Sequence, residues 1–223
     1  IIPLKTQYEI CKTTRDNILV PPYNVARVIA RPFLGKNGTY TRTTNRKDFS
    51  LSPPSATILD LLKQEGINTV AIGKINDLFN HKGITIAEFT KSNLQGCNKI
   101  SEYSSKVQNS LIFTNLVDFD VYFGHRNDPE GFASALKEFD NYLPAFLESL
   151  HETDRLVITA DHGNDPTTPS TDHSREYVPL LYFGKNRKPV NLGIRSSFSD
   201  VAKTVADYFD IKNDLNGISF LNE

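Results

Sequence analysis

The stretch "SLIFTNLVDFDVYFGHRNDPEGFASALKEFDNYLPAFLESL" at residues 110–150, with "RLVITA" at 155–160, decides the fold class. The apolar run at 110–120 predicts a strand. Asp128 then predicts a helix N-cap with Pro129 in the first helical position, and apolar residues recur at helical spacing beyond it. The second run predicts a buried strand. Strand, helix and strand in succession are typical of an α/β fold with a largely parallel sheet flanked by helices.

The same alternation continues on both sides of this stretch. Apolar spacing predicts helices at 55–66 and 197–209, and short apolar runs predict strands at 67–74 and 178–184. Ligands of such sheets collect beyond the carboxyl ends of the strands. Polar residues after the strands are therefore the candidates for a site.

The first 50 residues or so have a different texture. "NVARVIARPF" at 24–33 and "TYTRTTNRKDFS" at 39–50 predict two strands joined by a turn that contains Asn-Gly. "SPPS" at 52–55 then separates this part from the alternating pattern. The chain is therefore expected to hold one large domain and part of another.

Composition excludes several classes of protein. With 223 residues, 39% of them hydrophobic, and a formal net charge of −1, the chain can bury a core and has no overall basic field for nucleic acid. No apolar run reaches the roughly 20 residues that span a bilayer. Two cysteines, Cys11 and Cys97, form no disulfide framework, which favours a reducing, cytoplasmic location.

Two carboxylates and three imidazoles follow two of the predicted strands: Asp120, His125, Asp161, His162 and His173. Such a mixed oxygen and nitrogen set suits Mn²⁺ or Zn²⁺ better than Ca²⁺. Five ligands exceed what one catalytic ion takes from protein, so they favour a two-metal site. Each residue alone also has a structural explanation, because aspartate caps helices and histidine satisfies core hydrogen bonds. Only their clustering favours a metal.

One alternative and two further expectations concern the neighbouring residues. Asp118 is an alternative ligand to Asp120, and Gly124 is expected to free the backbone to turn before His125. His81 and His151 lie outside the pattern and are predicted to be surface residues.

Five stretches carry a resemblance. "TNLVDFDVYFGHRNDPEGFASALKEFD" at 114–140 and "VITADHGNDPTTPSTDHSREYVPLL" at 157–181 are similar to the phosphopentomutase family of the alkaline phosphatase superfamily. "VARVIARPF" at 25–33, "YTRTTNRKDFSL" at 40–51 and "AIGKINDLF" at 71–79 continue the likeness. It implies an alkaline phosphatase-like core and part of a small α/β cap domain. It also implies a manganese-dependent isomerase of nucleoside catabolism that interconverts ribose or deoxyribose 1-phosphate and 5-phosphate.

The resemblance implies a role for each metal candidate. Asp120, His125 and His173 resemble the ligands of one manganese ion, and Asp161 and His162 resemble ligands of the second. Family members also use a phosphorylated threonine and a sugar bisphosphate activator.

The resemblance also implies a pocket for the pentose phosphate. Arg27, Arg42 and Lys74 resemble positions that hold the phosphate and the sugar, and Ile29 would add a backbone contact. Guanidinium groups bind phosphate oxygens in a bidentate way, and lysine adds a point charge. From the residues alone, solvated surface charges explain these three side chains equally well. Arg187, in a polar turn, is expected to be such a solvated charge.

The family's nucleophilic threonine and one further metal aspartate have no match here. Residues 1–51 are therefore expected to be the C-terminal part of the cap, and 52–223 the C-terminal majority of the core. No threonine near the candidate sites is assigned as nucleophile: Thr41, Thr43, Thr44, Thr167 and Thr168. Two alternatives stay open, a metal-dependent phosphatase or phosphodiesterase of the same superfamily and a non-catalytic metal-binding fragment.

Overall fold

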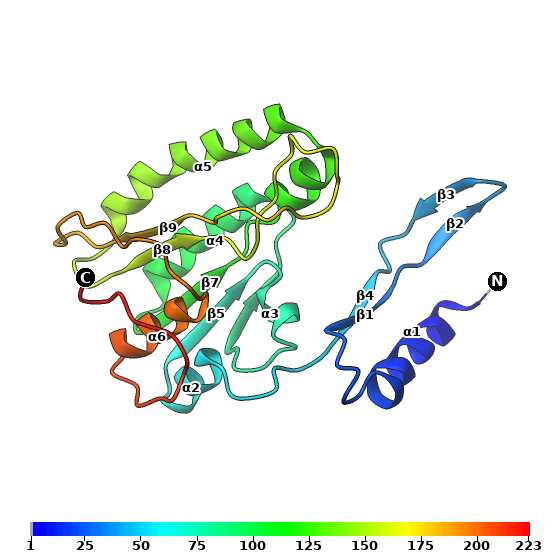
Figure 1. Cartoon of the computed structure of the whole chain (residues 1–223), viewed down its shortest axis with the longest axis horizontal. Helices are drawn as coiled ribbons and strands as arrows, with labels where there is room; N and C mark the ends of the chain where they lie inside the picture. Colours follow the sequence, from blue (N-terminus) through cyan, green and yellow to red (C-terminus); the bar gives the residue numbers. More distant parts are fainter. Residues whose placement is uncertain (1) are drawn as a thin grey trace. The chain divides into compact units, whose positions relative to one another are not determined.

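A computed structural model describes residues 2–223 and divides them into two compact units (Figure 1). The smaller unit holds the chain up to Ser55 together with Asn76–Lys82, and the larger unit holds Ala56–Ile75 and Gly83–Glu223. A short helix, α3 (Ile75–Leu78), begins at Ile75, the last residue of the segment Ala56–Ile75, and continues into the segment Asn76–Lys82.

The smaller unit is a helix followed by a β-ribbon. Its elements are α1 (Leu4–Thr13), a π-helical segment (Thr14–Ile18), β1 (Arg27–Ala30), β2 (Phe33–Lys36), β3 (Thr39–Arg42) and β4 (Lys47–Ser50). β1 pairs with β4 and β2 with β3, both antiparallel. Asn37 and Gly38 form the turn with φ angles of 52° and 87°, as a type I′ hairpin turn requires. The predicted strand pair around Asn-Gly is confirmed.

The larger unit contains one parallel sheet and one antiparallel strand pair. Its elements are α2 (Ile58–Gln64), β5 (Asn68–Ile72), β6 (Ile86–Glu88), α4 (Asn93–Lys106), β7 (Ser110–Thr114), α5 (Pro129–Ser149), β8 (Leu156–Thr159), β9 (Leu180–Phe183) and α6 (Ser199–Tyr208). The parallel sheet has the order β6-β5-β7, and β8 pairs with β9. The predicted α/β class with helices flanking a parallel sheet is confirmed.

The core forms around the central strand β5. Val70, Ala71 and Ile72 are almost completely buried, as are Leu59 and Leu62 on one face of α2. These five side chains explain why a short apolar strand and a short amphipathic helix are stable here, because each removes its apolar face from water.

Helix boundaries follow the predicted signals. α2 ends just before Gly66, which has a φ of 70°. The Asp128 side chain accepts a hydrogen bond of 2.9 Å from the backbone N–H of Gly131, and so caps α5. α5 continues through Pro144 to Ser149.

Three strand predictions need correction. The run at 110–120 is a strand only as far as Thr114, and the chain then enters irregular backbone. β8 is half-buried rather than buried. β9 runs antiparallel to β8, so this part of the larger unit departs from a parallel arrangement.

Two helices, α1 and α4, were not predicted, because their sequences are polar and few of their residues are buried. α4 buries only Gly96 and Cys97, and α1 has no buried residue at all. Burial raises the pKa of the Cys97 thiol to about 11, so this thiol stays protonated. Both cysteines are free, as expected.

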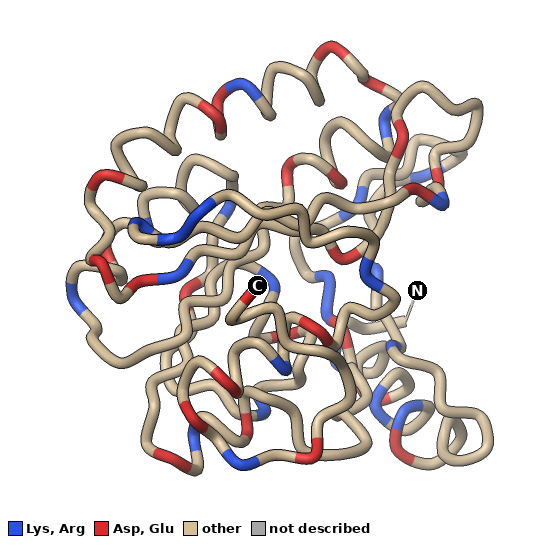
Figure 2. Tube along the Cα trace, turned by 60° about the vertical axis from the view of Figure 1, so that its left-hand side comes forward, with Lys and Arg blue, Asp and Glu red and all other residues tan. Residues whose placement is uncertain are grey.

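Charged residues of both signs are interspersed along the chain (Figure 2), in keeping with its balanced charge. No helix within residues 2–223 is long and apolar enough to cross a bilayer. The expectation that Arg187 is a solvated surface charge is wrong. Its guanidinium lies 5.0 Å from the centre of the Tyr182 ring and donates a hydrogen bond to the Glu223 carbonyl.

A buried ion pair fastens the C-terminal segment to α6. Arg195 Nε donates to Asp200 Oδ2 at 2.8 Å, and Ile218 N donates to Asp200 Oδ1 at 2.9 Å. Asp200 is only 3% exposed. Burial by itself raises the Asp200 pKa, but the Ile218 N–H and the Arg195 guanidinium together hold it below its ordinary value.

We predict that Arg195→Ala lowers the free energy of unfolding by about 3 kcal/mol, because it leaves a buried carboxylate without its cation. Urea denaturation at pH 7 measures this. Lys5→Ala is the control: the Lys5–Glu9 pair is exposed, so its loss should change little. Because the folded Asp200 pKa is lowered, its contribution is present above the unfolded value of about 3.9 and is lost as pH falls through the folded value. Asp200→Asn should therefore flatten the acid side of the stability curve, and an unchanged curve would contradict this assignment.

Candidate metal centre

The first half of the candidate site follows β7. The chain leaves the strand at Thr114 and forms a π-helical turn, Phe119–Phe123, and then a 3₁₀ turn, Gly124–Arg126. Asp120 lies on the first turn and His125 on the second. Asp120 Oδ1 is 3.3 Å from His125 Nε2, so the two tight turns bring these side chains together at the carboxyl side of the parallel sheet.

The second half of the site is a loop that folds back on itself after β8. Ser174 N donates to the Gly163 carbonyl at 3.2 Å, which forms an isolated β-bridge. A Cβ atom on Gly163 would lie 2.5 Å from the Ser174 carbonyl oxygen, so only glycine permits this approach. The bridge stacks the His162 and His173 rings with their centres 3.7 Å apart. The return of His173 to the side of His162 is therefore the result of one backbone pairing.

The two halves meet at Asp120. Its Oδ1 atom is 3.3 Å from His125 Nε2 and also 3.3 Å from His173 Nε2. Two donors that each lie about 2.1 Å from one ion, at tetrahedral to octahedral angles, are about 3.0–3.4 Å apart. The three residues offer ligand atoms that all lie within 4.8 Å of one another. This donor set fits a divalent transition-metal ion.

His162 lies beside this group and Asp161 at its edge. His162 Nε2 is 4.0 Å from Asp120 Oδ1 and 3.7 Å from Asp161 Oδ1, and the Asp161 side chain is 66% exposed. Asp161 and His162 together offer two donors, fewer than an ion takes from protein at a closed site. Further oxygen ligands would have to complete a second ion's coordination.

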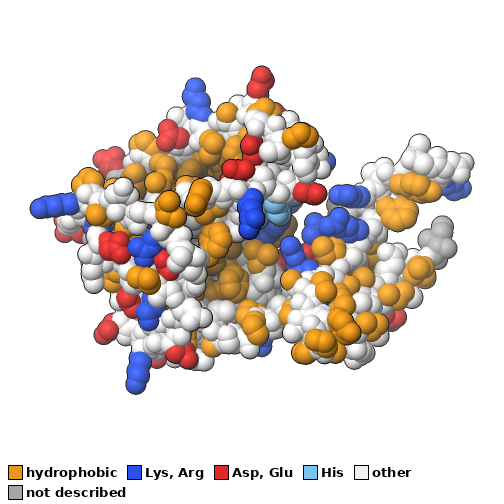
Figure 3. All heavy atoms as spheres, in the orientation of Figure 1, with side chains coloured by type: hydrophobic (Ala, Val, Ile, Leu, Met, Phe, Trp, Pro, Cys, Tyr) orange, Lys and Arg blue, Asp and Glu red, His pale blue; other side chains and the backbone are white. Residues whose placement is uncertain are grey.

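The orientation of His125 is set from outside the cluster. His125 Nδ1 lies 2.6 Å from the Thr171 carbonyl oxygen, which can only accept a hydrogen bond. Nδ1 therefore carries a proton, and in the neutral imidazole the lone pair is on Nε2, toward Asp120 and His173. An outer hydrogen bond of this kind usually fixes the tautomer of a metal-binding histidine. Figure 3 shows a histidine side chain (pale blue) at the surface, against a basic side chain and close to acidic ones.

Asp118, the alternative to Asp120, is not among the three residues whose ligand atoms lie together. Its Oδ2 atom accepts a hydrogen bond of 2.7 Å from Asn93 N, and so joins the start of α4 to the segment after β7. The expected reason for a glycine at position 124 is wrong. Gly124 has an ordinary helical φ of −61° and is not needed to turn the backbone. Instead, a Cβ atom there would lie 2.1 Å from the Asn164 side-chain nitrogen. Asn164 itself went unnoticed in the sequence, although it comes directly after the Asp-His-Gly motif.

The predicted phosphate and sugar ligands lie in different units. Lys74, half-buried, follows β5 of the larger unit, where Gly73 has a φ of 79°. Arg27 and Ile29 lie on β1 of the smaller unit, and Arg42 is exposed on β3. His81 and His151 are exposed, as predicted.

The Arg27 guanidinium takes part in an ion pair but in no hydrogen bond within residues 2–223. Its Nη1 atom is 3.7 Å from Asp48 Oδ2, beyond hydrogen-bond range. Both Asp48 oxygens are occupied by Arg46, at 2.9 and 3.0 Å. The N–H donors at the edge of the planar Arg27 guanidinium can therefore still bind another anion.

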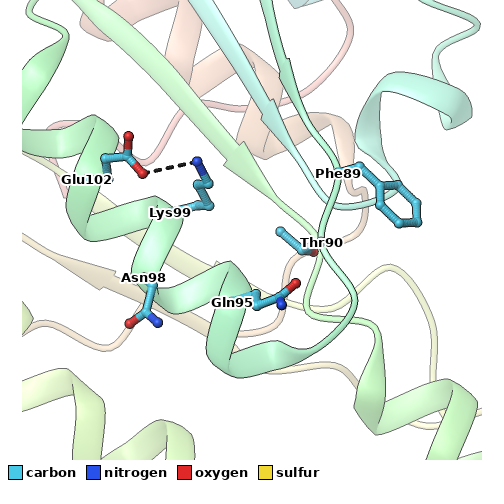
Figure 4. A pocket seen from close by; sticks show the side chains of 6 residues that line it. All are labelled: Phe89, Thr90, Gln95, Asn98, Lys99 and Glu102. Atoms are coloured by element: carbon cyan, nitrogen blue, oxygen red, sulfur yellow. Dashed lines mark ion pairs between the residues drawn. The ribbon is translucent and has the colours of Figure 1, made fainter.

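A separate hollow of about 350 Å³ lies in the larger unit between the end of β6 and α4 (Figure 4). Its lining residues are Phe89, Thr90, Gln95, Asn98, Lys99 and Glu102. Lys99 Nζ lies 3.1 Å from Glu102 and 3.2 Å from Glu88, so its charge is already neutralised. None of the residues predicted to bind a metal, a phosphate or a sugar lines this hollow.

The fold and the cluster agree with comparisons to known proteins. A family model described as the Metalloenzyme superfamily matches residues 10–213, and the chain therefore belongs to this superfamily, whose fold is alkaline phosphatase-like. Among curated relatives, the phosphopentomutase of Dictyoglomus thermophilum is 54% identical over 223 residues, which are 100% of this chain and 57% of that protein. The phosphopentomutases of Clostridium kluyveri and Acetivibrio thermocellus are 52% and 54% identical, each over 99% of this chain and 57% of their own length.

The chain thus resembles phosphopentomutases along its whole length and spans just over half of theirs. Among solved structures, protein PH0037 from Pyrococcus horikoshii superposes with a TM-score of 0.55 at 14% identity, covering 80% of this chain and 59% of that one. At this identity the likeness concerns the fold alone.

Asp120 and Asp118 provide a direct test of the cluster. We predict that Asp120→Asn weakens Mn²⁺ binding at least about 10–100-fold, the range for loss of an outer partner of a ligand. Asp118→Asn should leave Mn²⁺ affinity unchanged within about two-fold and instead lower stability, because it alters the contact with Asn93 N. Titration of each purified variant with Mn²⁺, followed by electron paramagnetic resonance, measures both affinities. Loss of binding in the Asp118 variant alone would reverse the assignment.

Proposed function

We propose that this chain is the greater part of a phosphopentomutase, which interconverts ribose or deoxyribose 1-phosphate and 5-phosphate. The observation that carries the proposal is that the ligand atoms of Asp120, His125 and His173 lie close together. They do so in a chain that is 54% identical, over all 223 of its residues, to a phosphopentomutase. The substrate would be a pentose phosphate, and the location cytoplasmic, in keeping with two free cysteines.

Two Mn²⁺ ions are part of this proposal. Asp120, His125 and His173 would hold one, and Asp161 and His162 would contribute to the second. Bound divalent ions would neutralise charge on the phosphoryl oxygens and orient them. The contributions of the chain itself are supported by its geometry. Thr171 keeps His125 in the tautomer with a free Nε2, and the Gly163–Ser174 bridge holds His162 and His173 side by side.

The chain's cationic side chains would bind the substrate. Arg27 and Arg42 would grip phosphate oxygens with planar guanidinium groups, Lys74 would add a point charge, and Ile29 would offer backbone atoms beside the sugar. The Arg27 donors make no hydrogen bond within residues 2–223, because Arg46 occupies the neighbouring Asp48 carboxylate, and this supports the place of Arg27 in the list.

The remaining chemistry needs a group that holds the phosphoryl between one sugar oxygen and another. A covalent nucleophile divides such a transfer into two easier steps. We propose that a phosphorylated threonine and a sugar bisphosphate activator serve this reaction. The threonine would belong to the 43% of the relatives' length that has no counterpart here, the complement of the 57% that the chain covers. On this view, residues 1–51 belong to a cap domain and 52–223 to the metal-binding core.

We predict that the 223-residue chain alone does not convert ribose 1-phosphate in the presence of Mn²⁺ and a sugar bisphosphate, because it supplies metal ligands but no nucleophile. The chain extended by the reading frame around it should be active. The measurement is formation of ribose 5-phosphate by both proteins, with hydrolysis of a simple phosphate ester assayed in parallel. Ester hydrolysis without mutase activity would favour a phosphatase or phosphodiesterase. An extended chain without either activity would favour a non-catalytic metal-binding protein.

In an active protein that carries this chain, Arg27→Lys should reduce kcat/KM for the pentose phosphate by a factor equivalent to about 1–3 kcal/mol. The charge is kept, but the bidentate geometry of the guanidinium is lost. Lys188→Ala is the control, since Lys188 is exposed in the larger unit, just after the turn at 185–186. Equal kinetics for the Arg27 variant and the control would place the phosphate elsewhere.

A further inference from the structure

Asn164 contacts the carboxylate at the centre of the cluster. Its Nδ2 atom donates a hydrogen bond of 2.9 Å to Asp120 Oδ1, across 44 residues of sequence. That oxygen is the same one that lies 3.3 Å from both His125 Nε2 and His173 Nε2. Asn164 therefore acts on the atom that faces the imidazoles.

The orientation of the Asn164 amide follows from its neighbour. A carboxylate only accepts hydrogen bonds, so the amide must turn its nitrogen toward Asp120. The other end of the amide, Asn164 Oδ1, is then buried without a hydrogen bond in the described part of the chain. Buried polar atoms are seldom left in this way, because the loss of their hydration costs free energy. The contact with Asp120 is thus made at the expense of the other amide atom.

Gly124 provides the space for this amide. A Cβ atom on Gly124 would lie 2.1 Å from Asn164 Nδ2, 2.5 Å from Cγ and 2.7 Å from Oδ1. All three atoms belong to the Asn164 side chain, so the contact disappears if residue 164 is alanine. Because Gly124 has a helical φ of −61°, alanine would cause no backbone strain there. Its three nearest contacts would all be atoms of the Asn164 side chain, so its main effect would be on that side chain.

We propose that Asn164 is a positioning residue for a divalent cation bound at Asp120, and that Gly124 is glycine in order to admit its amide. The inference rests on the metal site of the proposed function. Without the Nδ2 hydrogen bond, the terminal torsion of the Asp120 side chain, which has a broad energy minimum, would no longer hold Oδ1 toward His125 and His173. Outer partners of this kind typically change metal affinity by about 10–100-fold.

The test uses the 223-residue chain and Mn²⁺ alone, with binding followed by electron paramagnetic resonance and folding by thermal denaturation. Asn164→Ala and Gly124→Ala should each weaken Mn²⁺ binding at least about 10-fold. The double variant should be no weaker than Asn164→Ala, because the added methyl group then meets no amide. This absence of additivity is a result that general destabilisation would not produce.

Asn213→Ala is the matched control. The Asn213 amide donates to the Ile211 carbonyl at 2.7 Å and accepts from Lys203 Nζ at 2.9 Å, and it contacts none of the predicted ligands. This variant should lower the melting temperature but leave Mn²⁺ affinity unchanged within about two-fold.

The outcomes separate the two proposals. If the unaltered chain binds no Mn²⁺, the metal site of the proposed function fails. If it binds Mn²⁺ and Asn164→Ala binds equally well, only the role of Asn164 is overturned. If one variant does not fold, the other single variant still decides, since both remove the same hydrogen bond. Additive losses in the double variant would also overturn the role, because Gly124 and Asn164 would then act separately.

Discussion

The backbone pairing of Gly163 with Ser174 is the constraint on which the candidate centre depends. It closes the loop after β8, so that His173 returns to stack on His162 and both rings face Asp120. A side chain at position 163 would meet the Ser174 carbonyl oxygen at 2.5 Å and open the loop. The chemistry of the site therefore rests on a residue that has no side chain to contribute.

Gly124, on the segment after β7, also acts by leaving space that a side chain would fill. Gly124 leaves room for the Asn164 amide, which in turn reaches Asp120. Asn127, three residues after Gly124, donates to the Thr168 carbonyl at 2.8 Å and joins the turns after β7 to the loop after β8. The segments are thus held together by outer hydrogen bonds, and the ligand atoms are oriented before any ion binds. Such preorganisation reduces the ordering that binding must bring about.

Much of the fold could be predicted from local signals, and the exceptions have physical causes. Asn37-Gly38 and the Asp128 cap have meaning within a few residues, and both are confirmed. The end of β7 was missed because apolar residues continue into the π-helical turn, where tertiary packing decides the conformation. The direction of β9 depends on a pairing partner that no local pattern identifies. At the site, the types of ligand atom could be predicted from the sequence. The role of Gly124 could not, because it depends on Asn164, which is distant in sequence.

The division of the larger unit into two hydrogen-bonded sheets has a mechanical consequence. Asp120 and His125 follow the parallel sheet, and His173 follows the antiparallel pair, so no ladder of strand hydrogen bonds joins the two groups within residues 2–223. Under the proposed function, an ion held by all three would act as a cross-link between the sheets. Unlike a disulfide, this cross-link would have a strength set by the free ion concentration, since a ligand stabilises the folded state by RT ln(1 + [L]/Kd). Metal supply would then govern how firmly the two halves of the core are joined.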